Sequence, residues 1–195
     1  MAQEDSTIIA IRHGETDWNA KGFRGGSGNM EILRGNIDVP LNAAGIAQVH
    51  TTAEKICQYP IEKVLSTPRF HRARQTRDII AQQCGVPAVD APEFAPYDPG
   101  DLSGHPLSAI LDVLEMLIEV PILQAPNGGT YADYFQNFAN AWAKLYAEYG
   151  GDDSRAVAVV LFGNEFRALP AVLYGKPIEK YTQQTVKPGQ FVVIH

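Results

Sequence analysis

Short apolar runs alternate along the chain with longer segments in which apolar residues recur every three or four positions. The short runs are typical of buried strands, and the longer segments of helices with one apolar face. Strands are predicted at residues 7–12, 63–66, 156–162 and 190–194, with a weaker one near 87–89. Because strands and helices alternate, we expect a three-layer α/β/α sandwich with a mostly parallel, doubly wound sheet.

Four helical segments fill the intervals between these strands. The first follows Asn42, a residue type that caps helix N-termini, and the second spans about 69–84 and ends at Gly85. The third and fourth are marked by apolar residues within 107–118 and 131–145. The pattern therefore predicts two helices before and two helices after the middle of the chain.

Composition limits the classes of function. The chain has 195 residues, of which 45% are hydrophobic and 19% charged, and its net charge is −6. We expect a single domain spanning residues 1–195, since no linker, repeat or low-complexity tract divides it. The negative charge disfavours binding to nucleic acid or to an anionic membrane. No apolar stretch approaches the roughly 20 residues of a membrane span, and the acidic N-terminal residues lack the apolar core of a signal peptide, so we expect a cytoplasmic protein. The sequence does not indicate an oligomeric state.

Two cysteines, Cys57 and Cys84, are the only ones in the chain. Their separation matches no metal-binding spacing, and both fall on predicted helices. We expect buried, reduced thiols, which behave as small apolar side chains.

The first predicted strand ends in Arg12, His13 and Gly14. An arginine and a histidine at the open edge of a parallel sheet suit an anionic ligand, and a histidine with one free ring nitrogen can attack phosphorus. This segment resembles the Arg-His-Gly signature of the histidine phosphatase superfamily, also called phosphoglycerate mutase-like. The resemblance implies that His13 is the nucleophile, that Arg12 and Asn19 bind phosphate, and that Gly14 allows the anion close to the backbone.

Two further motifs carry the resemblance. Residues 65–76 are similar to the family's strand-to-helix turn, which implies that Arg72 is the second phosphate-binding arginine. Residues 38–48 match Asp-x-Pro-Leu followed by a helix start, and we expect this motif to be architectural, with a turn, a helix cap and close packing at Gly45. Between the motifs, the glycine-rich segment 22–34 reads as a surface loop that either is simply solvated or carries Arg24 or Arg34 toward a ligand.

The chain departs from the family at the end of its fourth predicted strand. Where the family has Ser-His-Gly, this chain has Phe162 before Gly163, so the resemblance implies that the second catalytic histidine is replaced by phenylalanine. A phenylalanine donates no hydrogen bond to a phosphoryl oxygen. Loss of one preorganised donor typically lowers a rate by about 10²–10³.

The sequence also leaves more than one candidate for the proton donor. Pro96 stands where many members of the family have a glutamate, and the nearest replacement is Asp98, which serves either as general acid or as a turn residue before Pro99. Asp101 and His105 are weaker candidates.

Several functions therefore remain. The first is a phosphomonoester hydrolase acting on a small phosphorylated substrate through a phosphohistidine at His13, with no metal or other cofactor because arginines supply the positive charge. The second is a mutase that uses the same intermediate. The third is a phosphate-binding or regulatory relative that is weak or inactive as a catalyst. The fourth is a variant in which Phe162 was introduced to block turnover.

Overall fold

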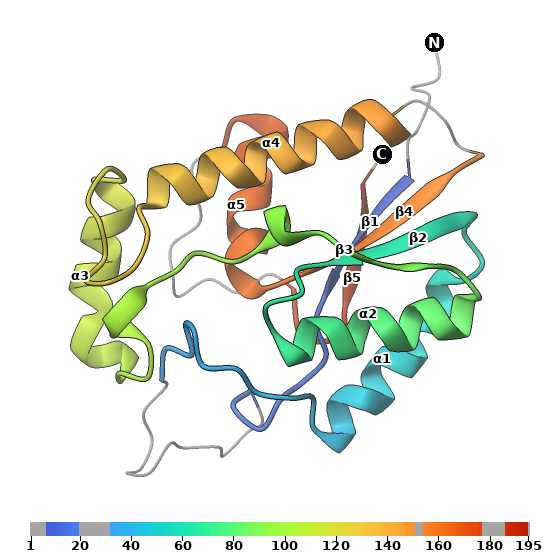
Figure 1. The fold of residues 1–195 in the computed structure, drawn as a ribbon, viewed down its shortest axis with the longest axis horizontal. Coiled ribbons are helices and arrows are strands. Elements are labelled where there is room, and N and C mark those ends of the chain that lie inside the picture. The colour runs from blue at the N-terminus through green and yellow to red at the C-terminus, as the bar shows by residue number, and fades with distance from the viewer. Residues whose placement is uncertain (1–6, 20–31, 151–153, 177–185, 195) are drawn as a thin grey trace.

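The computed structural model describes residues 7–19, 32–150, 154–176 and 186–194. Within these residues five strands form one sheet in the order β3-β2-β4-β1-β5 (Figure 1). The strands are β1 (Thr7–Arg12), β2 (Ile61–Ser66), β3 (Ala88–Asp90), β4 (Ala156–Leu161) and β5 (Phe191–Ile194). All neighbouring pairs are parallel except β1 with β5, which is antiparallel. The predicted mostly parallel sheet is therefore confirmed.

Helices cover both faces of this sheet (Figure 1). They are α1 (Ala43–Ile56), α2 (His71–Cys84), α3 (Leu107–Glu119), α4 (Tyr131–Tyr149) and α5 (Gly163–Tyr174), with short 3₁₀ turns η1 (Pro92–Phe94) and η2 (Gly100–Leu102). Helices α1 and α2 lie on one face, α4 and α5 on the other, and α3 lies beyond the edge of the sheet. None of the helices in the described ranges has the length and apolar character needed to cross a membrane.

The sheet separates two apolar cores because alternate side chains of a strand point to opposite faces. In β1, Ile8 and Ala10 pack with the α4 side, whereas Ile9 and Ile11 pack with the α1 and α2 side. Every residue of β1 and of β4 is buried. These two central strands are therefore rigid supports for whatever follows their carboxyl ends.

Local signals account for several element boundaries. The side chain of Asn42 accepts the Gly45 backbone N–H at 2.7 Å and begins α1, and Gly85 adopts a left-handed conformation (φ 70°) that ends α2. Helix α2 begins at His71, two residues later than predicted, because Phe70 is extended. The Asp38 carboxylate accepts the backbone N–H of His71 at 2.8 Å, so the architectural role expected for the 38–48 motif is confirmed.

The prediction of reduced thiols is wrong. Cys57 and Cys84 form a disulfide, with their Cα atoms 5.0 Å apart and a sequence separation of 27. Helices α1 and α2 pack side by side, and each cysteine stands at the C-terminal end of its helix. The fold thus brings together two half-buried residues within the distance range of disulfides, a proximity that sequence spacing did not indicate.

Candidate active site

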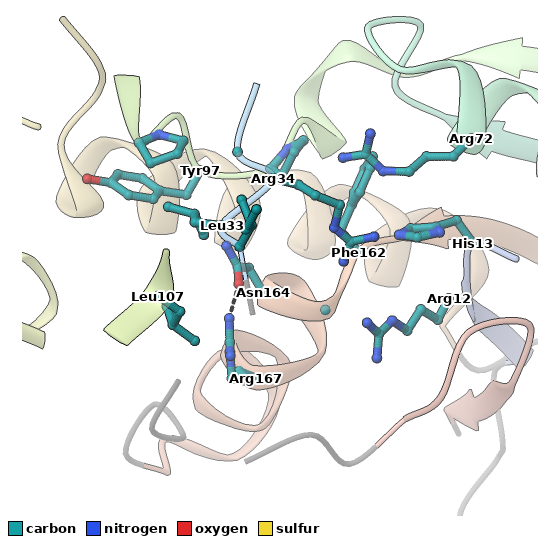
Figure 2. Close-up of a pocket in the computed structure, with 15 residues that line it drawn as sticks. Arg12, His13, Leu33, Arg34, Arg72, Tyr97, Leu107, Phe162, Asn164 and Arg167 are labelled. Atoms are coloured by element: carbon teal, nitrogen blue, oxygen red, sulfur yellow. Dashed lines mark hydrogen bonds between the residues drawn. The ribbon is translucent and has the colours of Figure 1, made fainter. Parts of the chain in front are cut away.

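A cavity opens at the edge of the sheet where β1 and β4 end, and it contains His13 (Figure 2). Its volume is about 100 Å³, well below the roughly 300 Å³ at the lower end of drug-sized ligand sites. Arginines line much of it, together with an apolar wall; the residues at the cavity are Arg12, His13, Ile32, Leu33, Arg34, Gly35, Arg72, Pro96, Tyr97, Pro99, Leu107, Phe162, Gly163, Asn164 and Arg167. The size and the charge suit a small anionic group.

His13 has the tautomer that a nucleophile needs. Its Nδ1 lies 2.7 Å from the Gly14 carbonyl oxygen, and because a carbonyl only accepts, Nδ1 carries the proton. Nε2 is then the ring nitrogen with the lone pair. Burial lowers the pKa of His13 well below 6.5, and the positive charges of Arg72, Arg34 and Arg12 lower it further. The imidazole is therefore neutral at neutral pH.

Backbone contacts hold the His13 segment on three sides. The His13 N–H donates to the Leu161 carbonyl at 3.1 Å, and the Gly14 N–H donates to the Thr76 hydroxyl at 3.2 Å. A Cβ on Gly14 would lie 2.6 Å from the Gly45 carbonyl oxygen, so no other residue fits there without displacement. The predicted close packing at Gly45 is confirmed, and it places α1 in direct contact with the segment that follows His13.

Arg12 is buried beside His13 and is anchored by its NH1 nitrogen, which donates to the Val186 carbonyl at 2.5 Å. Burial lowers its pKa to about 10, with smaller contributions from the charges of Arg34 and Arg167. The first residue of α5 is glycine, and a Cβ on Gly163 would lie 3.3 Å from Arg12 NH2. The positive end of α5 therefore adds to the charge of the guanidinium group.

Arg72 projects from the first turn of α2 and stacks on two aromatic rings. Its Cζ lies 4.5 Å from the Phe70 ring centroid and 4.9 Å from that of Phe162. NH1 donates to the Ile37 carbonyl at 3.3 Å, while the buried Nε has no hydrogen-bond partner among the described residues. Burial, followed by the charge of Arg34, lowers the pKa of Arg72 to about 9. The Asp38 carboxylate, 3.9 Å from NH1, compensates part of the charge of this buried guanidinium group, and an anion in the cavity would compensate more of it.

Phe162 follows β4 and faces His13, with their ring centroids 5.4 Å apart. It is 5% exposed and also contacts Phe70 edge-on. The structure brings Arg12, His13, Gly14, Arg72 and Phe162 together, although they come from three separate strand ends. The predicted assembly of these side chains at one sheet edge agrees with their positions; their chemical roles stay predictions.

Asn19 does not line the cavity. Its Oδ1 accepts hydrogen bonds from the Thr16 hydroxyl at 2.9 Å and from Arg34 NH1 at 2.8 Å, and it is Arg34 that reaches the cavity. Of the two arginines in the glycine-rich segment, Arg24 lies outside the described residues. Arg34 lines the cavity, and this position agrees with the alternative in which the glycine-rich segment carries an arginine toward a ligand.

The Asp98 carboxylate is hydrogen-bonded to other residues and does not line the cavity. Its carboxylate accepts hydrogen bonds from Asn36 at 2.5 Å, from the Gly100 backbone N–H at 2.9 Å and from Arg69 at 3.3 Å. These bonds outweigh partial burial and lower its pKa, which is unfavourable for a proton donor. The geometry favours the turn role that we weighed against the general-acid role. Asp101 and His105 are exposed and also lie outside the lining.

Two cavity residues were missed in the sequence. Arg167 and Asn164, on the first turns of α5, are hydrogen-bonded to each other and line the cavity (Figure 2). Residues three positions apart lie on the same face of a helix. Because Asn164 and Arg167 have this spacing and directly follow the strand end at Phe162-Gly163, the sequence could have indicated that both face the cavity. They extend the positive surface beyond Arg12.

Comparisons with known proteins identify the class. The model of the histidine phosphatase superfamily (branch 1) matches residues 8–195. The chain therefore belongs to this superfamily, and the resemblance noted in the sequence is confirmed.

The names of individual relatives refer to both phosphatases and phosphoglycerate mutases. The chain is 28% identical over 170 residues to the uncharacterized phosphatase PhoE of Bacillus subtilis, covering 87% of this chain and 78% of the relative. It is 31% identical over 103 residues to a protein of Yersinia pestis named "Probable phosphoglycerate mutase GpmB", covering 53% of this chain but only 43% of that protein. The fold matches the α-ribazole phosphatase of Shigella flexneri with a TM-score of 0.73 at 22% identity, covering 97% of this chain and 90% of the other.

Proposed function

We propose that the chain is a phosphomonoester hydrolase that acts through a phosphohistidine on His13. The observation that carries the proposal is the orientation of the imidazole, with Nδ1–H bonded to the Gly14 carbonyl and Nε2 left as the nucleophile in a cavity lined by arginines. A neutral imidazole with a fixed direction meets the requirement for attack on phosphorus.

The reaction has two steps. Nε2 of His13 forms a bond to phosphorus as the ester P–O bond breaks, and the leaving oxygen takes a proton from water. A second water then attacks phosphorus, the N–P bond breaks, and phosphate leaves while the proton of that water passes to solvent. Arg12 and Arg72 hold the phosphoryl oxygens throughout, and water serves as the proton donor because Asp98 is hydrogen-bonded elsewhere. No metal takes part in this proposal.

The experiment is hydrolysis of p-nitrophenyl phosphate by the purified chain and two variants. We expect slow turnover that disappears in His13→Ala, and at least about a tenfold acceleration in Phe162→His, because a donor is restored beside the phosphoryl group. Unchanged rates in both variants would overturn the proposal. Activity should survive EDTA, and its loss would contradict the metal-free mechanism.

A phosphate-binding relative without turnover is the second candidate, and the donor-free Phe162 ring next to His13 favours it. Saturable binding of phosphate with no release of product, in both the parent chain and Phe162→His, would support that candidate. A mutase would instead return the phosphoryl group to the substrate, so transfer to an added hydroxy acid rather than to water would identify it.

Location forms a separate proposal. We keep the cytoplasm as the predicted compartment, although the disulfide argues the other way because structural disulfides are rare there. Alkylation of free thiols in intact cells before lysis decides the matter: cysteines blocked by alkylation support a reducing compartment, and cysteines protected in the disulfide overturn it.

A further inference from the structure

Phe162 forms one wall of the cavity, and its side chain offers no hydrogen bond to a transferring phosphoryl group. The Phe162 ring lies 5.4 Å from the His13 ring and packs against Phe70 and Arg72, so it fills the space next to the imidazole. In phosphoryl transfer, negative charge spreads over three equatorial oxygens. Arg12 and Arg72 approach from two directions, and a third donor is needed beside Phe162.

Arg34 is placed to be that donor. Its side chain extends from the segment before α1 toward His13 and Phe162, and it lines the same cavity as Arg12 and Arg72 (Figure 2). Arg34 is close enough to all three groups for its positive charge to lower the pKa of Arg12, His13 and Arg72. A cation that acts on the nucleophile and on both phosphate arginines stands next to the position of a bound phosphoryl group.

The arginine is also held in place by the turn that follows the nucleophile. Arg34 NH1 donates to Asn19 Oδ1 at 2.8 Å and to the Thr16 hydroxyl at 3.4 Å. The turn itself is closed by the Asn19 N–H, which donates to the Thr16 carbonyl at 2.8 Å, and Thr16 is fully buried. Donors that are oriented before the substrate arrives need no reorganisation during the reaction, which is the condition for strong stabilisation.

We propose that Arg34 stabilises the phosphoryl group during its transfer to and from His13, in place of the donor that position 162 lacks, and that Asn19 is the residue that positions Arg34. This rests on the proposed function. The bonds formed and broken are those already given for hydrolysis. Arg34 keeps its protons and contributes charge and hydrogen bonds to the oxygens that become more negative.

The test is a double-mutant cycle between Arg34 and position 162, with kcat and KM measured for p-nitrophenyl phosphate. In the parent chain, Arg34→Gln should lower kcat by about 10²–10³ with little change in KM, and Arg34→Lys should retain part of the activity because it keeps the charge. In the Phe162→His background, where a second donor is present, Arg34→Gln should cost about tenfold or less. Asn19→Ala should lower kcat in the parent chain but add nothing to Arg34→Gln.

The matched control is Arg155→Gln, the same charge change at the opposite end of β4, where Arg155 is paired with Glu62 on the surface. It should leave kcat within about twofold, since exposed ion pairs contribute little. Equal losses for Arg34→Gln in both backgrounds would overturn the inference, and so would a loss confined to KM. His13→Ala separates this result from the proposed function, because His13-dependent turnover in the parent chain establishes the latter independently of Arg34.

Oxyanion binding tests the inference even if the parent chain turns nothing over. Vanadate adopts the five-coordinate geometry of the transferring group, whereas inorganic phosphate mimics only the bound ground state. Arg34→Gln should weaken vanadate binding at least about tenfold more than phosphate binding, because the proposed contact strengthens in the transition state. Equal weakening of the two anions, or no weakening of either, would overturn the inference.

Discussion

Glu165 is a buried carboxyl group whose ionisation should limit the stability of this protein. It is 0% exposed on the third residue of α5, where one carboxylate oxygen accepts the Phe162 backbone N–H at 3.0 Å and the other lies 3.4 Å from the Tyr134 hydroxyl. Burial raises its pKa from 4.5 to about 7, against the opposing effect of these hydrogen bonds and of Arg167. The group that caps the helix behind Phe162 is thus protonated at mildly acidic pH.

The direction of the shift sets the direction of the pH dependence. Between pH 4.5 and about 7 the folded chain binds this proton more tightly than the unfolded chain does. The associated stability is fully present below pH 4.5 and is lost as the pH rises through 7. At about 1.4 kcal/mol per pKa unit, the shift corresponds to roughly 3 kcal/mol. Glu165→Gln keeps an acceptor for the Phe162 N–H but has no charge to bury, so it should remove this loss.

The assay is urea unfolding of the parent chain and Glu165→Gln at pH 5, 6, 7 and 8, with the exposed Glu54→Gln on α1 as the matched control. The free energy of unfolding of Glu165→Gln minus that of the parent should grow by about 2.5 kcal/mol from pH 5 to pH 8, because part of the effect is already present at pH 5. Contributions shared by both proteins, including that of His13, cancel in this difference. A difference that stays constant with pH, or that is matched by Glu54→Gln, would refute the reasoning.

Three other consequences can be measured. Replacing Cys57 and Cys84 together by serine should lower the free energy of unfolding by about 3–4 kcal/mol, the loop-closure value for a separation of 27 residues, as seen in urea titrations; unchanged midpoints would contradict it. Gly45→Ala places a Cβ 2.6 Å from the Glu15 backbone nitrogen, so it should lower the free energy of unfolding by about 1–3 kcal/mol. Because it should also displace the His13 segment by the order of 1 Å, we expect kcat to fall about 100-fold. A variant with parental stability and parental kcat would show that the backbone adjusts to the added Cβ without consequence. Because the pKa of His13 is lowered, kcat/KM should stay level from neutral pH to below pH 6, whereas an acid limb centred near 6.5 would mean that burial does not keep the imidazole neutral.

Much of the site could be predicted because its determinants are local in the sequence. Arg12 ends the buried strand β1 and His13 follows it directly, and Arg72 is the second residue of α2, which follows β2 after a four-residue turn. In a parallel sheet the carboxyl ends of neighbouring strands share one edge, so position in the chain translates directly into position in space. The caps at Asn42 and Gly85 are equally local: Asn42 begins α1 and Gly85 ends α2 where the sequence indicated.

Other features depend on contacts between distant segments and carry no local signal. The Cys57–Cys84 disulfide requires the C-terminal ends of α1 and α2 to lie next to each other. The Asp98 carboxylate accepts hydrogen bonds from Asn36 and Arg69, which belong to other segments of the chain. Asn19 was expected to bind phosphate, and in the structure its side chain accepts a hydrogen bond from Arg34 and does not line the cavity. In each case the sequence drew attention to the residue but did not reveal its bonding partner. The partner depends on how helices and loops that are distant in the sequence pack together.

The position of β1 between β4 and β5 has a consequence for how the protein folds. The Arg12 N–H donates to the Gln190 carbonyl, the His13 N–H donates to the Leu161 carbonyl, and the Gly189 N–H donates back to the Arg12 and His13 carbonyls. The segment that carries the nucleophile is therefore closed by residues about 150–180 positions later in the chain. Such non-local pairing slows folding, since a long loop must close before its contacts form. During synthesis the segment that carries His13 cannot form these bonds until β4 and β5 have left the ribosome, and until then the apolar β1 lacks both of its neighbouring strands.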